Sequence, residues 1–257
     1  MSPDPASEAG PPPGPEGARR PRWVEWPGPQ ARWGLGEVAV GILLSQFLLV
    51  LAQVVVVSLA GWESSEQVPI WAVALLQVPM WAGWLVALVL AGAKGDGPVR
   101  EFGFAVRPID VPVGLGLGLL LQFVVLPLVY WPILELLGQT RDDLAEPARE
   151  LAEKATGPVG WATLVLVVVV GAPIVEELFY RGLLLGALRK RHVPPVLAAV
   201  LSGAVFAAMH LQPLQFPGLF VLGTLLGLLV LRTGRLGGAI VAHATFNAVT
   251  VAALALG

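Results

Sequence analysis

The sequence contains no cysteine. This absence excludes disulfide bonds, thiolate metal ligands and a cysteine nucleophile. Charged residues are also scarce: they make up 13% of the chain, whereas soluble domains contain about 25%. The net charge of −2 gives no general attraction to nucleic acid, and no Walker or Rossmann glycine loop is present. These absences argue against nucleic-acid-binding and nucleotide-binding proteins.

Hydrophobic residues are abundant instead, at 56% of the chain, and the mean hydropathy is +0.75. Apolar runs of about twenty residues, the length that crosses a bilayer, recur along the sequence. The composition therefore predicts an all-α polytopic transmembrane helical bundle with about seven spans, and at most eight. The predicted spans lie near residues 37–59, 69–92, 111–135, 160–188, 195–211, 216–231 and 237–256.

The basic residues are distributed unevenly between the two ends of these spans. If the N-terminus is cytoplasmic, twelve of the sixteen fall in inner segments: Arg19, Arg20, Arg22, Arg32, Lys94, Arg100, Arg107, Arg189, Lys190, Arg191, Arg232 and Arg235. Three fall in outer segments, namely Arg141, Arg149 and Lys154, and Arg181 lies within a span. Because cytoplasmic loops are enriched in Lys and Arg, we predict a multi-pass membrane protein with a cytoplasmic N-terminus.

The fourth span contains charged residues that are costly in a bilayer and are therefore candidates for function. Glu177 and Arg181 are four residues apart, so they share a helix face and can form an ion pair. Glu176 is rotated by about 100° from Glu177 and is expected to share a face with Tyr180. We therefore expect Arg181 to hold one carboxylate, leaving the other free to act as a general base.

Two further spans contain histidine. The fifth ends with Phe206 and His210, and the seventh contains His243 and Asn247, which are four residues apart on one face. If these groups converge with Glu176, they supply a base, a proton shuttle and donors for an oxyanion. Alternatively, two histidine nitrogens and a carboxylate could bind a zinc ion with one open position.

Their convergence requires irregular helices. In a straight-helix topology His210 lies near the outer end of its span, whereas His243 lies about 10 Å from the inner face at 1.5 Å per residue. Tilted or broken helices around a water-filled cavity are permitted in a membrane protein. Pro213 and Pro217, just after His210, favour such a break.

Three motifs carry a resemblance to a known family. Glu-Glu-x-x-x-Arg at 176–181, Phe-x-x-x-His at 206–210 and His-x-x-x-Asn at 243–247 resemble the motifs of the CPBP family (CAAX protease and bacteriocin-processing, or Abi). That family includes the type II CAAX prenyl endopeptidases. The resemblance implies an intramembrane endopeptidase in a bacterial plasma membrane, with membrane lipid and a membrane-associated peptide or protein, including a lipidated one, as its partners. It implies no nucleic-acid partner, particular substrate or oligomeric state.

The resemblance also implies a role for each matching residue. Glu176 would activate water as the general base, His210 would hold or polarise that water, and His243 and Asn247 would stabilise the oxyanion. Supporting roles would fall to Glu177, Arg181, Phe206 and Tyr180. Both metal-free glutamate catalysis and zinc hydrolysis are compatible with the resemblance, and the zinc ligands would be Glu176, His210 and His243.

These predictions divide the chain into four parts. Residues 1–32 are rich in Pro and Gly and are expected to be disordered. Three accessory transmembrane helices follow at 33–135, with Gly114 and Gly118 suited to close helix packing and Gln77 and Gln122 to interhelical hydrogen bonds. A polar amphipathic loop or helix is expected at 136–159. The catalytic transmembrane core with the three motifs is expected at 160–257.

Two non-protease alternatives remain at this point. A membrane scaffold or bacteriocin-immunity protein of the same fold would bind a partner without cleaving it. A proton-coupled transporter would use the intramembrane Glu and Arg as an ion path, although the sequence shows no inverted repeat of the kind found in many transporters.

Overall fold

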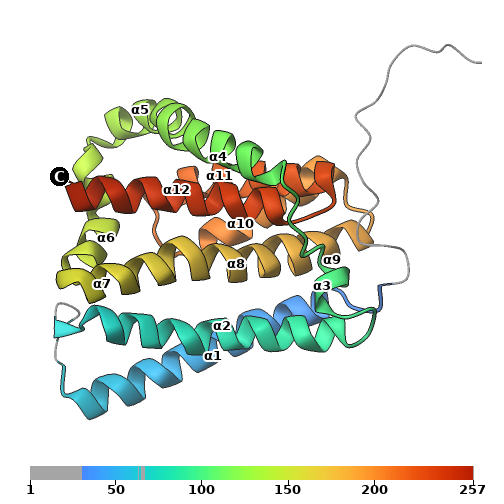
Figure 1. The fold of residues 1–257 in the computed structure, drawn as a ribbon, viewed down its shortest axis with the longest axis horizontal. Helices are drawn as coiled ribbons and strands as arrows, with labels where there is room; N and C mark the ends of the chain where they lie inside the picture. Colours follow the sequence, from blue (N-terminus) through green and yellow to red (C-terminus); the bar gives the residue numbers. More distant parts are fainter. Residues whose placement is uncertain (1–30, 63, 65–66, 257) are drawn as a thin grey trace, which may run out of the picture.

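The computed structural model describes residues 31–62, 64 and 67–256, and within these ranges all regular secondary structure is helical (Figure 1). The predicted all-α class is confirmed. The expected disordered tail lies outside the described residues except for its last two positions. The first helices are α1 (Leu35–Ala60), α2 (Ile70–Gly92), α3 (Pro98–Glu101), α4 (Asp110–Leu120) and α5 (Leu126–Leu137), the last two joined by a π-helical segment, η2 (Leu121–Val125).

The second half of the chain begins with the polar helix α6 (Arg141–Glu153) and continues into one long helix of five consecutive segments. These are α7 (Gly157–Leu164), η3 (Val165–Gly171), α8 (Ala172–Glu176), η4 (Glu177–Leu184) and α9 (Leu185–Lys190). Three further helices complete the fold: α10 (Pro195–Ala208), α11 (Phe216–Thr233) and α12 (Gly237–Leu256).

Six of the seven predicted spans are long and apolar enough to cross a membrane: α1, α2, α4–α5, α7–α9, α11 and α12. The seventh, α10, has only 14 residues. At 1.5 Å per residue it extends for about 21 Å, which is shorter than the hydrocarbon core of about 30 Å. The chain therefore turns back at His210 before α10 has crossed a full bilayer thickness.

The helices pack around the long helix α7–α9. In Figure 1, α1 and α2 lie side by side below it, and α10, α11 and α12 lie above or behind it. Helix α4 packs along α12 on the far side. One hydrophobic cluster includes Trp84 of α2, Phe179 of η4, Phe206 of α10 and Leu226 of α11. The accessory and motif-bearing helices therefore share a core.

Contacts with α4 and with the segment before it hold the start of α12 in place. Arg235 in the α11–α12 turn pairs with Asp110 at the start of α4, with 2.6 Å between Nη2 and Oδ1. This hydrogen-bonded pairing raises the pKa of Arg235. The backbone N–H groups of Leu236 and Gly237 donate to the carbonyls of Gly103 and Ala105 at 2.9 and 3.1 Å. These contacts fix the position of α12, which carries His243.

The glycine-rich run of α4 packs closely against a neighbouring helix, as predicted, and the structure shows that this helix is α12. A Cβ atom on Gly114 would lie 2.6 Å from Cβ of Val241, and one on Gly118 would lie 2.6 Å from the Ala242 carbonyl oxygen. Gly116 faces the other way, because nothing lies within 4 Å of its Cβ position. The two helix backbones therefore approach closely at two of the three glycines.

This difference gives a matched test of the packing. We expect Gly118→Ala to lower the free energy of unfolding by about 1–3 kcal/mol, because the added methyl forces α4 away from α12. Gly116→Ala adds the same methyl in open space and should be neutral or slightly stabilising. Denaturant unfolding of both variants in detergent would measure the difference. Equal destabilisation by the two substitutions would show that the α4–α12 contact is looser than described.

Candidate active site

The long helix that carries Glu176 and Glu177 departs from α-helical geometry on both sides of Pro173. Proline has no N–H, so it cannot donate the hydrogen bond that continues an α-helix. Two π-helical segments flank it, η3 before and η4 after. Such segments occur mostly as short bulges, frequently at functional sites. Here they change the rotation of the side chains that follow Glu176.

A line of charged and polar side chains crosses the interior between this helix and α12. Arg181 Nη1 donates to Glu177 Oε1 at 2.7 Å, which is the ion pair expected from their spacing. The same oxygen accepts a hydrogen bond from His243 Nδ1 at 2.8 Å. His243 Nε2 faces Glu176, 3.8 Å from Oε2. The order across the interior is therefore Arg181, Glu177, His243 and Glu176.

All four of these residues are removed from solvent. Arg181 and Glu177 are fully buried, His243 is 3% exposed and Glu176 is 7% exposed. Buried charges are tolerated when they are paired, and Glu177 is paired by both Arg181 and His243. Glu176 has no neighbour as close, which leaves its carboxylate available for another partner.

An aromatic shell encloses the charged line. The Phe206 ring lies edge-to-face with His243, Tyr180 and His210, at centroid distances of 5.7, 5.2 and 4.7 Å. The guanidinium of Arg181 lies 4.5 Å from the Phe206 ring centroid, within the range of a cation–π contact. Phe206 therefore touches both histidines and the arginine, and it sets the distance between them.

Tyr180, which the sequence predicts on the same helix face as Glu176, is buried in the aromatic shell. Its ring packs against Trp84, Phe179 and Phe206 and is 1% exposed. Unlike Glu176, it does not line the cavity described below.

His210 reaches the site from the turn that follows α10. Its Nδ1 lies 2.8 Å from the carbonyl oxygen of Phe206. A carbonyl only accepts, so this nitrogen carries the proton and Nε2 is left with a lone pair in the neutral ring. Leu211 follows with a φ of 55° and reverses the chain. The break at this turn allows His210 and His243 to line one cavity, as the expectation of broken helices requires.

Asn247 lies one turn beyond His243 on α12. Its Nδ2 donates to the carbonyl oxygen of Val168 at 2.8 Å. Val168 belongs to the π-helical segment η3. A side-chain amide has two N–H donors, so this contact orients Asn247 and leaves one donor for a ligand.

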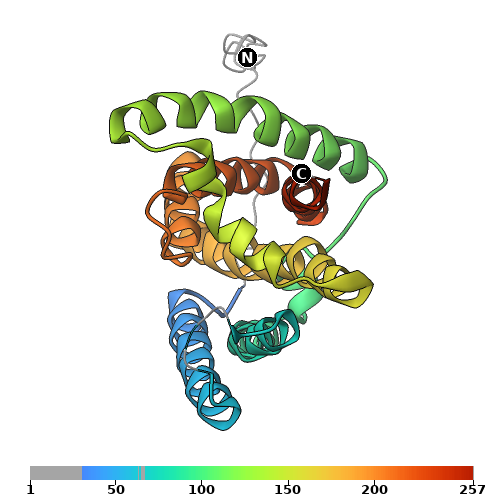
Figure 2. The same ribbon diagram turned by 90° about the vertical axis from the view of Figure 1, so that its left-hand side faces the viewer.

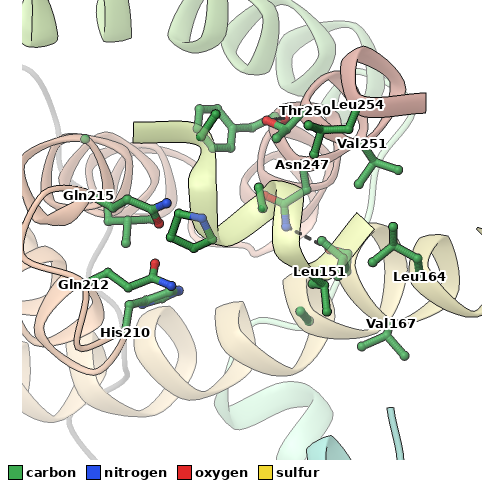
Figure 3. Close-up of a pocket in the computed structure, with 18 of the residues that line it drawn as sticks. Leu151, Leu164, Val167, His210, Gln212, Gln215, Asn247, Thr250, Val251 and Leu254 are labelled. Atoms are coloured by element: carbon green, nitrogen blue, oxygen red, sulfur yellow. Dashed lines mark hydrogen bonds between the residues drawn. The ribbon is translucent and has the colours of Figure 1, made fainter. Parts of the chain in front are cut away.

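Glu176, His210, His243 and Asn247 line one cavity of about 460 Å³. Figure 3 shows His210, Gln212 and Gln215 on one side of it, and Asn247 and Thr250 with apolar residues on the other. These apolar residues are Leu164, Val167, Val251 and Leu254. The cavity therefore combines a polar wall with an apolar wall, and the four predicted residues lie together in it.

Several lining residues were not predicted as site residues. Gln77 and Gln122 were assigned to interhelical hydrogen bonds, but both line the cavity together with Tyr130, Gln212 and Gln215. Tyr130 donates to the Gln215 carbonyl at 2.9 Å and accepts from the Gly218 N–H at 3.0 Å, which holds the turn after His210. In the sequence, the only signal for Gln77 and Gln122 was that each is a polar amide within an apolar span.

The three residues considered as zinc ligands do not form a metal-binding group. Within the described residues, no cluster of three or more His, Cys, Asp or Glu side chains is arranged to hold a metal ion. As they are arranged here, Glu176, His210 and His243 therefore do not fit the zinc alternative.

The apolar helices and the buried polar site define an integral, multi-pass membrane protein with an intramembrane site. The family model for Type II CAAX prenyl endopeptidase Rce1-like proteins matches residues 158–249, which include all three motifs. This part of the chain is therefore similar to the CAAX-type proteases of the CPBP family. Neither the curated proteins nor the solved structures contain a match to this chain.

Proposed function

We propose that this protein is an intramembrane endopeptidase that uses Glu176 to activate water against a peptide bond of a membrane-associated substrate. The observation that carries the proposal is the unequal environment of two adjacent carboxylates. Glu177 is held by Arg181 at 2.7 Å and His243 at 2.8 Å, whereas Glu176 faces the cavity. The match to the type II CAAX prenyl endopeptidase family supports this assignment.

Glu176 is the general base of the proposed reaction. Its carboxylate takes a proton from a water molecule as the water oxygen attacks the substrate carbonyl carbon. The tetrahedral intermediate then collapses, the C–N bond breaks, and the leaving amine nitrogen receives the proton from Glu176. Proton transfer by a positioned side chain of this kind typically contributes about 10²–10⁴-fold in rate.

His243 and its partners set the charge beside Glu176. Glu177 accepts the Nδ1–H of His243, and Arg181 balances the negative charge of Glu177. A protonated Nε2, 3.8 Å from Glu176 Oε2, would donate a hydrogen bond to a developing oxyanion in the adjacent space.

Asn247 and His210 complete the proposed site. The Asn247 N–H that Val168 does not use is a second oxyanion donor. The His210 Nε2 lone pair accepts a hydrogen bond from the attacking water and orients it towards the carbonyl carbon. A hydrogen bond of 2.8 Å to a backbone carbonyl orients each side chain, from Nδ2 in Asn247 and from Nδ1 in His210.

The test is cleavage of a peptide library by the purified protein. Wild-type protein in detergent should cleave a subset of lipidated and unlipidated membrane peptides, detected by mass spectrometry, and Glu176→Ala should not. Cleavage should persist with 1,10-phenanthroline, because the donor set does not fit zinc. Inhibition that added zinc reverses would contradict the metal-free mechanism, and cleavage by Glu176→Ala would contradict the assignment of the base.

The library test also separates the protease from a scaffold. A protein that cleaves none of the peptides, and whose Glu176→Ala variant still performs its cellular task, would be a non-enzymatic membrane scaffold. Glu150→Ala, an exposed position on α6, is the matched control because it removes a carboxylate outside the site. It should cleave the same peptides as wild type.

A further inference from the structure

The helix made of α4, η2 and α5 forms one wall of the active-site cavity. Its first segment packs against α12 and its last segment packs against α11, and Figure 2 shows this helix, in green, lying across both. The π-helical segment η2 is in the middle of the helix, between the two contacts. Gln122 of η2 lines the cavity from this position, together with Leu126 and Tyr130 of α5.

The carboxamide oxygen of Gln122 is a buried acceptor in this wall. Oε1 is inaccessible to solvent, and no described residue donates a hydrogen bond to it. Other polar side chains of the cavity are held by the protein itself: the Tyr130 hydroxyl makes two hydrogen bonds, and Gln215 Nε2 donates to the Leu144 carbonyl oxygen at 3.0 Å. Because buried polar groups in folded proteins are nearly always hydrogen-bonded, the oxygen of Gln122 indicates a partner that enters the cavity.

A peptide substrate brings the complementary group. In the hydrocarbon region each backbone N–H needs a hydrogen-bond partner. A segment whose peptide bond is accessible to Glu176 is not helical at that bond, so its N–H groups there have no partners within the segment. The substrate N–H and the Gln122 oxygen would each be costly to bury alone, and one hydrogen bond between them satisfies both.

We propose that Gln122 is a substrate-binding residue, whose Oε1 accepts a hydrogen bond from a main-chain N–H of the bound peptide. This inference rests on the proposed function and specifies what the site recognises: the backbone of a non-helical segment, independently of its side chains. The geometry of η2 supports this role, because π-helical segments are frequently found at functional sites. Glu176 and Asn247 act on the bond that is cleaved, whereas Gln122 holds the main chain of the substrate.

Replacement of Gln122 by methionine removes the acceptor and keeps most of the side-chain volume. With a library peptide that the wild type cleaves in detergent, Gln122→Met should raise KM about tenfold, because the substrate N–H loses its partner. The value of kcat should be unchanged, since the hydrogen bond is made in the ground state and in the transition state alike. Gln53→Met, the same change at an exposed position on α1, should alter neither constant. An unchanged KM for Gln122→Met would overturn the inference and leave the proposed function intact.

Amide-to-ester substitution in the peptide identifies the donor. An ester replaces one main-chain N–H of the peptide with an oxygen atom, which cannot donate. For the wild type, an ester at the position that Gln122 binds should raise KM about tenfold. Gln122→Met should show no further loss with the same peptide, because both changes remove one hydrogen bond. Equal losses in the two proteins at every ester position would show that the partner is not a main-chain N–H and would overturn the inference.

Thermal unfolding tests the inference without any peptide. Methionine removes a buried oxygen that has no partner among the described residues. Gln122→Met should therefore unfold in detergent at the same temperature as the wild type or at a higher one. A lower unfolding midpoint would show that Gln122 stabilises the fold through a partner of its own, which would contradict its assignment to the substrate.

Peptide binding separates this inference from the proposed function. The fluorescence anisotropy of labelled library peptides would compare binding to Glu176→Gln with binding to the Glu176→Gln/Gln122→Met double variant. A Kd about tenfold higher for the double variant would support the role of Gln122, even if the wild type cleaved none of the peptides and the protease proposal failed. Equal Kd values, or no binding to either protein, would overturn the role of Gln122.

Discussion

Replacement of Glu176 by glutamine is expected to lower the rate of peptide cleavage by about 10²–10⁴-fold, the usual contribution of a general base. Glutamine has nearly the same shape as glutamate but cannot accept the proton of the attacking water. The binding of substrate to the apolar wall of the cavity, formed in part by Leu164 and Val251, should change little. Measured as single-turnover cleavage of a library peptide, the loss should therefore appear in the rate of the chemical step.

Folding should be unaffected by the same substitution. The ion pair of the Glu176 carboxylate in the described part of the chain is its 3.8 Å approach to His243 Nε2, and His243 keeps its closer partner Glu177 at 2.8 Å when that charge is removed. The thermal unfolding midpoint of Glu176→Gln should equal that of wild type in detergent. Glu150→Gln, the same chemical change at an exposed position on α6, should retain full activity. A Glu176→Gln protein that keeps more than a tenth of the wild-type rate would exclude Glu176 as the base.

Arg181→Met is expected to give the largest loss of stability, about 3–5 kcal/mol, because it leaves the Glu177 charge buried without its cationic partner. Both side chains of the pair are fully buried, and Nη1 and Oε1 are 2.7 Å apart. Methionine fills much of the same volume, so little of the loss should come from a cavity. The substitution also removes the cation–π contact with Phe206 at 4.5 Å.

A double-mutant cycle separates the charge effect from packing. Glu177→Gln in the Arg181→Met background removes the uncompensated charge, and the double variant should recover much of the lost free energy of unfolding. Unfolding of the four proteins by denaturant in detergent would measure the coupling. A double variant that is as unstable as the sum of the two single variants would show that Arg181 acts through packing and not through its charge.

The two adjacent glutamates therefore have separable expected phenotypes. Substitution at Glu176 should reduce catalysis and leave stability unchanged. Disruption of the Arg181–Glu177 pair should reduce stability, and it should reduce catalysis only through the position of His243, which Glu177 holds at 2.8 Å. Proteins with scaffold or transport functions would not be expected to show this particular division, because neither function requires a base for peptide hydrolysis.

Local spacing in the sequence was sufficient to predict the membrane spans, one buried ion pair and one close helix contact. Apolar runs of about twenty residues identified the spans, because only helices of that length satisfy their backbone hydrogen bonds across a bilayer. The four-residue spacing of Glu177 and Arg181 was sufficient to predict their ion pair, since residues four apart meet on a helix surface. The close contact of Gly114 and Gly118 with a neighbouring helix was also predictable, although the sequence did not name α12 as the partner.

The convergence of side chains from different helices depends on the tertiary structure, because the periodicity of residues in the sequence describes one helix at a time. The turn after α10 brings His210 to the cavity that His243 also lines. Gln77 and Gln122 face the cavity only because α2 packs against the long helix and η2 packs against α12. The sequence by itself determined which groups are polar inside a membrane protein. Which of them converge depends on long-range packing that no local pattern encodes.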